Sequence, residues 1–198
     1  MKKLLKITAL LLAAAAMFVG CKNNAETTTP EDDDKLILFP EEDVSTSVNY
    51  NAITCSDGEW IGAYEEIIKT SYRTTTRFIK VKFTVSDNGS TCNYTRIYEK
   101  ETKEESTTGF AQSVIEANKA SYEADGYTVE LSDNKLKATK TAMGDETLFS
   151  LTTSMGIRAF TTKAQEVSPK TNADKTKYYG YGRSADYRDT YTFYLMKK

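Results

Sequence analysis

The chain has 198 residues, with 26 Lys and Arg, 28 Asp and Glu, and no histidine. That length suits one domain, and the missing histidine excludes Ser-His-Asp, Cys-His and histidine-ligated metal catalysis, which all need an imidazole. The acidic balance argues against nucleic acid as a partner, because affinity for phosphate backbones comes from basic side chains. We therefore expect a protein that is not an enzyme, holds no cofactor or metal, and binds no nucleic acid.

The first twenty residues are typical of an export signal. Met1–Lys6 is short and basic, and Ile7–Gly20 is uncharged, mostly apolar, and small at its end. The apolar run is shorter than the ~20 residues needed to cross a bilayer, and Lys22-Asn23-Asn24 follows it at once. We therefore predict a cleaved signal peptide over residues 1–20 rather than a transmembrane anchor.

The signal ends in Phe18-Val19-Gly20-Cys21, which resembles the lipobox of bacterial lipoproteins, with Phe18 in the place of the usual Leu. The resemblance implies a diacylglycerol on the Cys21 thiol, cleavage before Cys21, and acylation of the new amine by a fatty acid such as palmitate. Two or three such chains make membrane attachment effectively permanent. This places the protein in the bacterial cell envelope, facing the periplasm or the cell exterior. The alternative is an ordinary secretory signal that contains a cysteine.

An acidic tether is expected over residues 21–35. Lys22–Lys35 offers no large apolar side chain for burial, which favours a solvated and extended segment. The adjacent carboxylates of Glu31–Asp34 lack the alternating ligands of a calcium site, and their repulsion from anionic headgroups would hold the body off the membrane. Residues 36–198 are then a single β-rich domain.

Threonine and tyrosine are abundant in this domain, and apolar and polar residues alternate, which favours strands. The expected strands are Val44–Tyr50, Glu59–Tyr64, Arg77–Val85, Thr91–Lys100, Tyr127–Leu131, Lys135–Lys140, Thr147–Thr153 and Tyr187–Met196. Asn88-Gly89 is a strong hairpin signal, because both positions tolerate positive φ. The alternation puts Tyr94 and Tyr98 on one face. Glu65–Arg73 fits either a helical turn or a strand.

One segment, Gly109–Ala124, has a different period, since Phe110, Val114 and Tyr122 recur near helical spacing. Serine and threonine precede it as caps, and Gly126 follows as a terminator. One helix among strands spaced about ten residues apart predicts a mainly β fold. We expect an antiparallel β-barrel or sandwich with one inserted α-helix near residues 109–124.

The single tryptophan stands in Gly58-Glu59-Trp60, at the start of the strand-rich body. Gly-x-Trp in the first barrel strand, with an arginine near the last strand covering the indole, resembles the motif of lipocalins and related calycins. Arg188 is the matching arginine, with Arg183 as the other candidate. The resemblance implies a lipocalin-like β-barrel whose floor is closed by Gly58, Trp60 and Arg188. The helix before the last strands departs from that family, and the alternative is a core aromatic of some other sheet.

Two cysteines remain once Cys21 is lipidated, and an even pair in an exported chain permits a disulfide between Cys55 and Cys92. Closing that loop would contribute ~3–4 kcal/mol by the chain-entropy relation. The alternative is a pair of buried, reduced thiols.

Catalytic motifs are scarce. Ser132-Asp133-Asn134-Lys135 merges two elements of penicillin-recognising enzymes that must be separate, so we interpret it as a turn. Glu65-Glu66 and Glu104-Glu105 are adjacent pairs, which point to opposite faces of a strand and cannot flank one bond. No phosphate loop, Cys-x-x-Cys or dinucleotide fingerprint occurs in the sequence.

The segment Lys177–Met196 combines many tyrosines with basic residues. Tyr187, Tyr191 and Tyr194 either form a contact face or ligand pocket, or pack between strands. Gly156–Lys198 is basic and Cys21–Glu66 is acidic. The basic part therefore meets either an acidic partner such as an anionic glycan, or the acidic part of the same chain.

These features favour a lipid-anchored protein of the cell envelope, without enzymatic activity, whose β-rich domain binds a small apolar ligand or a partner surface. The first alternative is a structural or adhesin-like surface lipoprotein without a small ligand. The second is a histidine-free hydrolase that uses two carboxylates about 5–9.5 Å apart.

Overall fold

The computed structural model describes residues 43–151, 164 and 166–198. The chain divides into two units, Met1–Asp33 and Asp34–Lys198, and every described residue belongs to the second. The predicted signal peptide, the lipidation site at Cys21 and the predicted tether lie outside the described residues.

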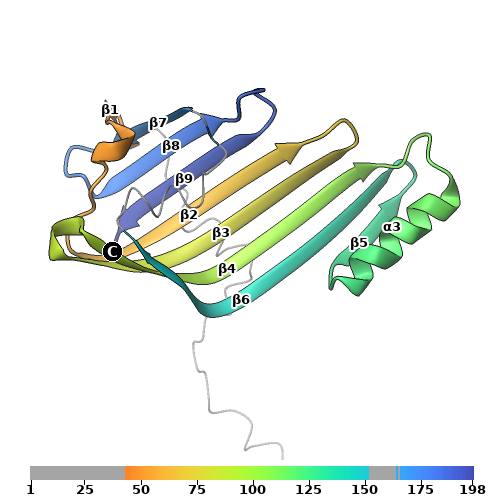
Figure 1. Cartoon of the computed structure of the whole chain (residues 1–198), viewed down its shortest axis with the longest axis horizontal. Helices are drawn as coiled ribbons and strands as arrows, with labels where there is room; N and C mark the ends of the chain where they lie inside the picture. Colours follow the sequence, from red (N-terminus) through yellow and green to blue (C-terminus); the bar gives the residue numbers. More distant parts are fainter. Residues whose placement is uncertain (1–42, 152–163, 165) are drawn as a thin grey trace, which may run out of the picture. The chain divides into compact units, whose positions relative to one another are not determined.

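The described strands form one antiparallel sheet of nine, in the order β1-β7-β8-β9-β2-β3-β4-β6-β5 (Figure 1). The strands are β1 (Thr46–Ser47), β2 (Gly58–Lys69), β3 (Arg73–Ser86), β4 (Thr91–Ser106), β5 (Thr128–Ser132), β6 (Lys135–Leu151), β7 (Glu166–Thr171), β8 (Lys177–Arg183) and β9 (Thr190–Lys197). The helix α3 (Gln112–Ala124) connects β4 to β5. The prediction of a mainly β, antiparallel fold with one inserted helix is confirmed, and the sheet is not closed into a barrel.

Both predicted hairpins are confirmed. Between β3 and β4, the short 3-10 turn η3 (Asp87–Gly89) has positive φ at all three of its residues. Gly89 is required for a second reason, because a Cβ there would lie 2.8 Å from the carbonyl oxygen of Cys55. The β5–β6 hairpin forms where Ser132 to Lys135 was interpreted as a turn. The glycine signal at Gly126 also holds, since its φ of 85° ends the helix.

Three strand predictions were wrong or incomplete. Val44–Tyr50 is not a strand: only β1 pairs with β7, and the 3-10 helix η2 (Tyr50–Ala52) follows. The ambiguous segment after Tyr64 continues β2 as far as Lys69, because it pairs with β3 over its whole length. The two expected strands between residues 135 and 153 are one strand, β6, within the described part of the chain. The sequence did not predict β7 or β8, and the strand expected from Tyr187 begins only at Thr190.

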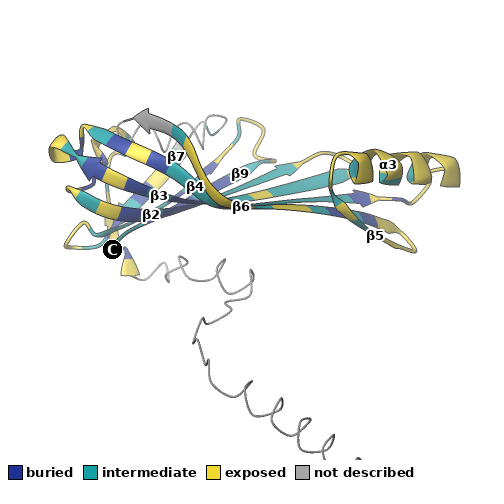
Figure 2. Ribbon diagram, turned by 90° about the horizontal axis from the view of Figure 1, so that it is seen from below, coloured by how far each residue is buried: buried dark blue, intermediate teal, exposed yellow. Residues whose placement is uncertain are grey.

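The core lies on the face of the sheet that carries Trp60, which we call the tryptophan face. Trp60, Phe83 and Tyr94 are direct cross-strand neighbours on β2, β3 and β4. Their rings are stacked, with centroids 6.2 Å apart for the first pair and 4.7 Å for the second. Cross-strand aromatic pairs add about 0.5–1.5 kcal/mol each beyond the burial of their area. Figure 2 shows how buried residues concentrate at this end of the sheet.

A β-bulge at Ile97 changes which residues of β4 belong to the tryptophan face. Val81 pairs with Arg96 and Lys80 pairs with Tyr98, so Ile97 stands outside the pairing on both sides of β4. Tyr98 therefore lies on the opposite face from Tyr94, contrary to the prediction. Beyond the bulge the tryptophan face receives the acidic residues Glu99, Glu101 and Glu105 instead of aromatic ones.

Candidate functional site

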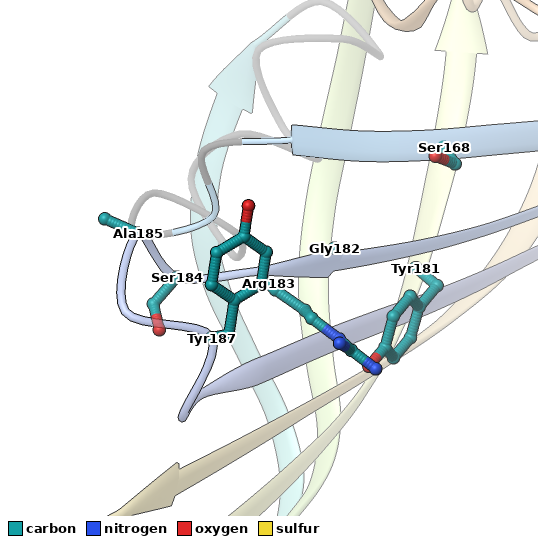
Figure 3. A pocket seen from close by; sticks show the side chains of 7 residues that line it. All are labelled: Ser168, Tyr181, Gly182, Arg183, Ser184, Ala185 and Tyr187. Atoms are coloured by element: carbon teal, nitrogen blue, oxygen red, sulfur yellow. The ribbon is translucent and has the colours of Figure 1, made fainter.

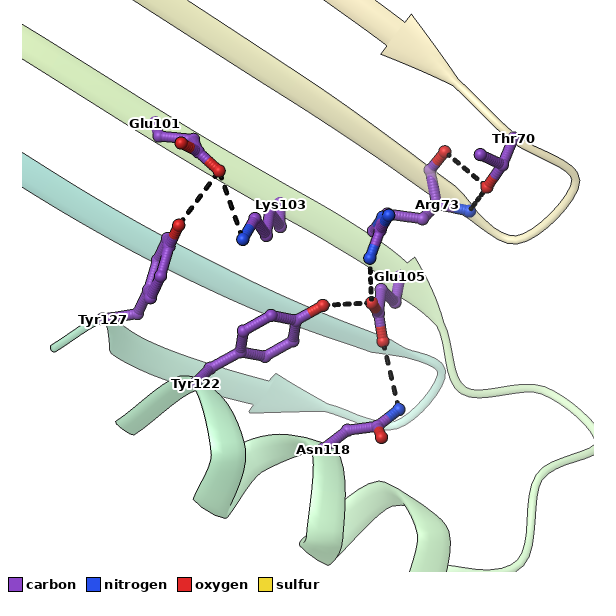
Figure 4. Close-up of polar contacts among 8 residues, drawn as sticks. All are labelled: Thr70, Arg73, Glu101, Lys103, Glu105, Asn118, Tyr122 and Tyr127. Carbon is purple, nitrogen blue, oxygen red and sulfur yellow. Dashed lines mark hydrogen bonds and ion pairs between the residues drawn. The ribbon is translucent and has the colours of Figure 1, made fainter. Parts of the chain in front are cut away.

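Glu105 is the centre of a polar network that attaches α3 to the sheet. This carboxylate is only 6% exposed. The Tyr122 hydroxyl donates a hydrogen bond to its Oε1, and the Asn118 Nδ2 donates to Oε2 at 3.3 Å. Arg73 on β3 forms an ion pair with Oε1 at 3.7 Å. Three elements thus converge on one carboxylate, and Figure 4 shows these side chains pointing toward it.

A second group of contacts lies beside it, at the C-terminal end of α3. The Tyr127 hydroxyl donates to Glu101 Oε1 at 2.9 Å, and the Lys103 Nζ lies 3.2 Å from the same oxygen (Figure 4). Lys103 also lies over the rings of Tyr127 and Tyr122, 4.4 Å and 5.2 Å from their centroids. Burial lowers the pKa of Lys103, but the hydrogen bonds to Tyr127 and Glu101 outweigh that effect and raise its pKa.

A hollow of about 250 Å³ opens between the first half of α3 and the ends of the strands beneath it. We call it the helix groove. Its apolar lining is Tyr72, Phe110, Val114, Ile115 and Leu136, and its polar lining includes Glu105 and Asn118. Tyr72, Phe110 and Val114 are each more than 40% exposed. Half-exposed apolar side chains that meet in a hollow are typical of a binding surface.

A smaller hollow, of about 150 Å³, lies at β7, β8 and the turn into β9. We call it the turn pocket. Arg183 extends along Tyr181 there: its Nε donates to the Tyr181 hydroxyl at 2.8 Å, and its guanidinium lies 5.5 Å from the ring centroid. Figure 3 shows these side chains together with Tyr187, whose ring rises from the turn and is 70% exposed.

The predicted tyrosine contact face is not a single surface. Tyr187 lies in the turn before β9, in the left-handed region at φ 57°. Tyr191 is buried on the tryptophan face, and burial first, then the nearby Glu66, Asp189 and Asp186, raise its pKa to about 12. Tyr194 lies on the other face, against Tyr179 at 5.1 Å. Alternation along β9 places Tyr191 and Tyr194 on opposite faces, and Tyr187 lines the turn pocket.

The residues of the lipocalin-like motif are not brought together. The indole N–H of Trp60 donates to the Ser56 carbonyl at 2.9 Å, and the ring is fully buried. Trp60 pairs with Lys197. Arg188 lies two residues before Thr190, which pairs with Ile67 toward the other end of β2. Arg188 instead pairs with Asp186 in the exposed turn. Gly58 begins β2 with a φ of 131°, so its role is in the backbone. No arginine of this motif covers the indole.

The predicted cysteine pair lies in the core. Cys55 and Cys92 are both buried in the cluster around Trp60, and the structure records both as thiols. A disulfide between them stays a prediction. Both thiols contribute, after burial, to raising the pKa of Tyr64 well above its ordinary value.

Comparisons with known proteins found no protein-family model that matches this chain, no similar curated protein, and no solved structure that matches it. In the part of the chain that the structure describes, no helix is long and apolar enough to span a bilayer. The same residues include no group of three or more carboxylate or thiol side chains that could share a metal ion.

The helix groove is the feature that the sequence did not reveal. Phe110 and Val114 were recognised as the apolar positions of a helix, which normally predicts that they are buried. Here the helix lies at the end of the sheet and its strongest contacts are polar. Its apolar residues are left partly uncovered.

Proposed function

We propose that this protein is a lipid-anchored, non-enzymatic binding protein of the bacterial cell envelope, and that its helix groove receives one apolar group of a small ligand. The single observation that carries the second part is the convergence of Tyr72, Phe110 and Val114 on one hollow. The lipobox-like segment ending at Cys21 supports the first part.

The size of the groove sets the size of the group. An apolar cavity of about 150 Å³ is sufficient to bind benzene. A groove of about 250 Å³ therefore accepts one aromatic ring or one branched aliphatic group, but not a whole drug-sized molecule. The rest of the ligand would extend into solvent along α3.

The chemistry of the groove favours an apolar group over a charged one. Glu105 is its one buried charge, and this carboxylate already receives Tyr122, Asn118 and Arg73. A cation entering the groove would have to displace one of these donors. An apolar group displaces only water from half-exposed side chains, which is favourable by about 25 cal/mol per Å² of apolar surface buried.

Hydrogen exchange of the mature lipoprotein in lipid nanodiscs tests the groove. Indole is the probe, because it is a single aromatic group of suitable size. We expect saturating indole to slow amide exchange in α3, and Val114→Asp to abolish that protection. Met143→Asp is the matched control, since Met143 is 62% exposed and lies outside the groove. Equal protection in both variants, or none in the unmodified protein, would contradict the proposal.

The anchor is tested separately. We expect intact-mass analysis of the membrane fraction to give a chain that begins at Cys21 and carries diacylglycerol and a fatty acyl group. Cys21→Ser should abolish lipidation and leave the protein unprocessed. A mature chain that is cleaved elsewhere and carries no lipid would favour the ordinary secretory signal instead.

A further inference from the structure

The turn pocket combines features that the helix groove lacks. Its lining includes two tyrosines, two serines and the backbone at Gly182. Its charged group is the Arg183 guanidinium, whereas the charged group of the helix groove is a buried carboxylate. The turn pocket lies on β7 and β8, toward the β1 edge of the sheet. It shares no lining residue with the helix groove. Its ligand must therefore be recognised by different chemistry.

Among the described side chains Arg183 has no ion-pair partner, and the register of β7 and β8 places the backbone of Glu166 opposite it. Within the described part of the chain its recorded side-chain partner is the Tyr181 hydroxyl, which takes up Nε only. The two terminal nitrogens of the guanidinium therefore keep the fork of donors that binds a carboxylate in bidentate fashion. The hydrogen bond to the Tyr181 hydroxyl restricts the orientation of that fork.

One carboxylate of the adjoining turn is already engaged. Asp186 accepts hydrogen bonds from the Ser184 hydroxyl at 2.6 Å and from Arg188 Nε at 2.6 Å. The bonds from Ser184 and then from Arg188 lower its pKa to about 2, so it stays ionised and committed to these partners. Arg188 in the turn is thus neutralised by Asp186, whereas Arg183 at the end of β8 has no ion pair among the described side chains.

The local charge supports an anionic ligand. Residues 166–198, which form β7, β8 and β9, contain seven basic and four acidic residues. An excess of positive charge raises the local concentration of anions and their rate of association.

The remaining lining suits a sugar ring. Tyr187 presents an exposed aromatic face, held in the turn by a hydrogen bond from its backbone N–H to the Ser184 carbonyl at 2.9 Å. The hydroxyls of Ser168 and Tyr181, with the backbone at Gly182, supply polar groups around the same hollow. A volume of about 150 Å³ holds one six-membered ring. Pyranoses have an apolar C–H face and a rim of hydroxyls, which matches this arrangement.

We propose that the turn pocket binds one acidic sugar residue, with its carboxylate on the Arg183 guanidinium and its ring against Tyr187. The sugar can be free or part of a glycan, because the pocket recognises a single ring. This proposal goes beyond the apolar ligand of the helix groove and does not depend on it.

Saturation-transfer NMR on the full mature chain in nanodiscs tests the proposal, with sodium D-glucuronate, D-glucose and sodium acetate as probes. At low salt we expect glucuronate to bind about tenfold more tightly than glucose or acetate, because only glucuronate offers both the carboxylate and the ring. Binding of glucuronate that is no tighter than that of glucose would overturn the proposal. Acetate binding as tightly as glucuronate would overturn it in favour of a simple anion site.

Two matched variants separate the pocket from the charge of the turn. Arg183→Gln should reduce glucuronate binding to the level of glucose, whereas Arg188→Gln, which removes the same charge from the same turn, should leave the preference intact. Tyr187→Ala should weaken both sugars by a similar factor. Equal effects of the two arginine substitutions would overturn the assignment. Protection of α3 by indole, measured on the same variants, reports on the helix groove independently.

Discussion

The two ends of the tryptophan face are stabilised by different forces. At the Trp60 end, aromatic rings stack in register across three strands and exclude water. At the other end, Glu105 and its donors hold α3 against the sheet. Apolar burial responds little to pH or salt, whereas charge-assisted hydrogen bonds respond to both. One sheet thus combines an apolar core around Trp60 with an end at α3 whose stability depends on the ionisation of Glu105.

The largest effect is expected from the aromatic end. Phe193 is fully buried, and its ring covers Gly180, where a Cβ would lie 2.1 Å from a ring carbon. Phe193→Ala should lower the free energy of unfolding by about 3–5 kcal/mol, through lost burial and a cavity. Urea titration followed by Trp60 fluorescence measures this. Tyr187→Ala, at an exposed ring, should stay within about 0.5 kcal/mol. Similar losses for both would remove the distinction between core and surface.

The helix end should show a smaller and more local effect. Glu105→Gln weakens the hydrogen bonds from Tyr122 and Asn118 and removes the ion pair with Arg73, which should cost about 1.5–3 kcal/mol. Glu104→Gln is the matched control, because Glu104 points to the other face and, among the described residues, forms its ion pair with Lys135 at the surface. Hydrogen exchange should accelerate in α3 for the first variant alone. Acceleration throughout the sheet would show that the two ends unfold together.

The dependence on pH sharpens the comparison at Glu99, between the two ends. Burial raises the pKa of Glu99, but hydrogen bonds from Arg77 and Arg96 outweigh it, so the pKa is lowered below its ordinary value of 4.5. A carboxyl with a lowered folded-state pKa stabilises the protein above its unfolded pKa, and that stabilisation is lost as pH falls through the folded value. Unfolding at pH 6 and at pH 3 should therefore differ less in Glu99→Gln than in the unmodified protein. An unchanged difference would show that this carboxylate does not contribute.

The smallest effects are expected from two buried tyrosine hydroxyls, Tyr178 in the cluster around Trp60 and Tyr191 opposite Glu66, toward the other end of β2. The Tyr178 hydroxyl donates to the Thr54 carbonyl at 3.1 Å, so Tyr178→Phe should cost about 1 kcal/mol. Within the described residues the Tyr191 hydroxyl is buried and has no hydrogen-bond partner. Tyr191→Phe should leave the unfolding free energy unchanged or raise it by up to ~1 kcal/mol. In thermal unfolding, Tyr178→Phe should therefore lower the midpoint and Tyr191→Phe should not, and a clear loss for Tyr191→Phe would reveal a partner.

The sequence predicted those parts of the fold that depend on local periodicity. The alternation in β3 placed Val81 and Phe83 on the core face, and Asn88-Gly89 located the turn, because both signals act over a few residues. Tyr98 was placed on the wrong face, because a bulge depends on how three strands pair and leaves no mark in one strand's pattern.

The candidate sites were harder to foresee for the same reason. Glu105 looked like one of two adjacent surface carboxylates, and its partners Tyr122 and Arg73 are distant in sequence. Arg183 was considered as a cover for Trp60, whereas the register places it beside Tyr181 at the edge of a pocket. The roles of Glu105 and Arg183 depend on contacts between residues that are distant in sequence, and the local pattern of the sequence does not reveal such contacts.

The extra residue at Ile97 also governs how this chain can change in length. Since Ile97 stands outside the pairing, its loss would make the β3–β4 pairing continuous and leave every later residue of β4 opposite its present partner on β3. Loss of one residue nearer to Glu105 would instead carry that carboxylate to the reverse of the sheet and release the helix. In its pairing with β3, the strand can therefore lose a residue at Ile97 without being turned over.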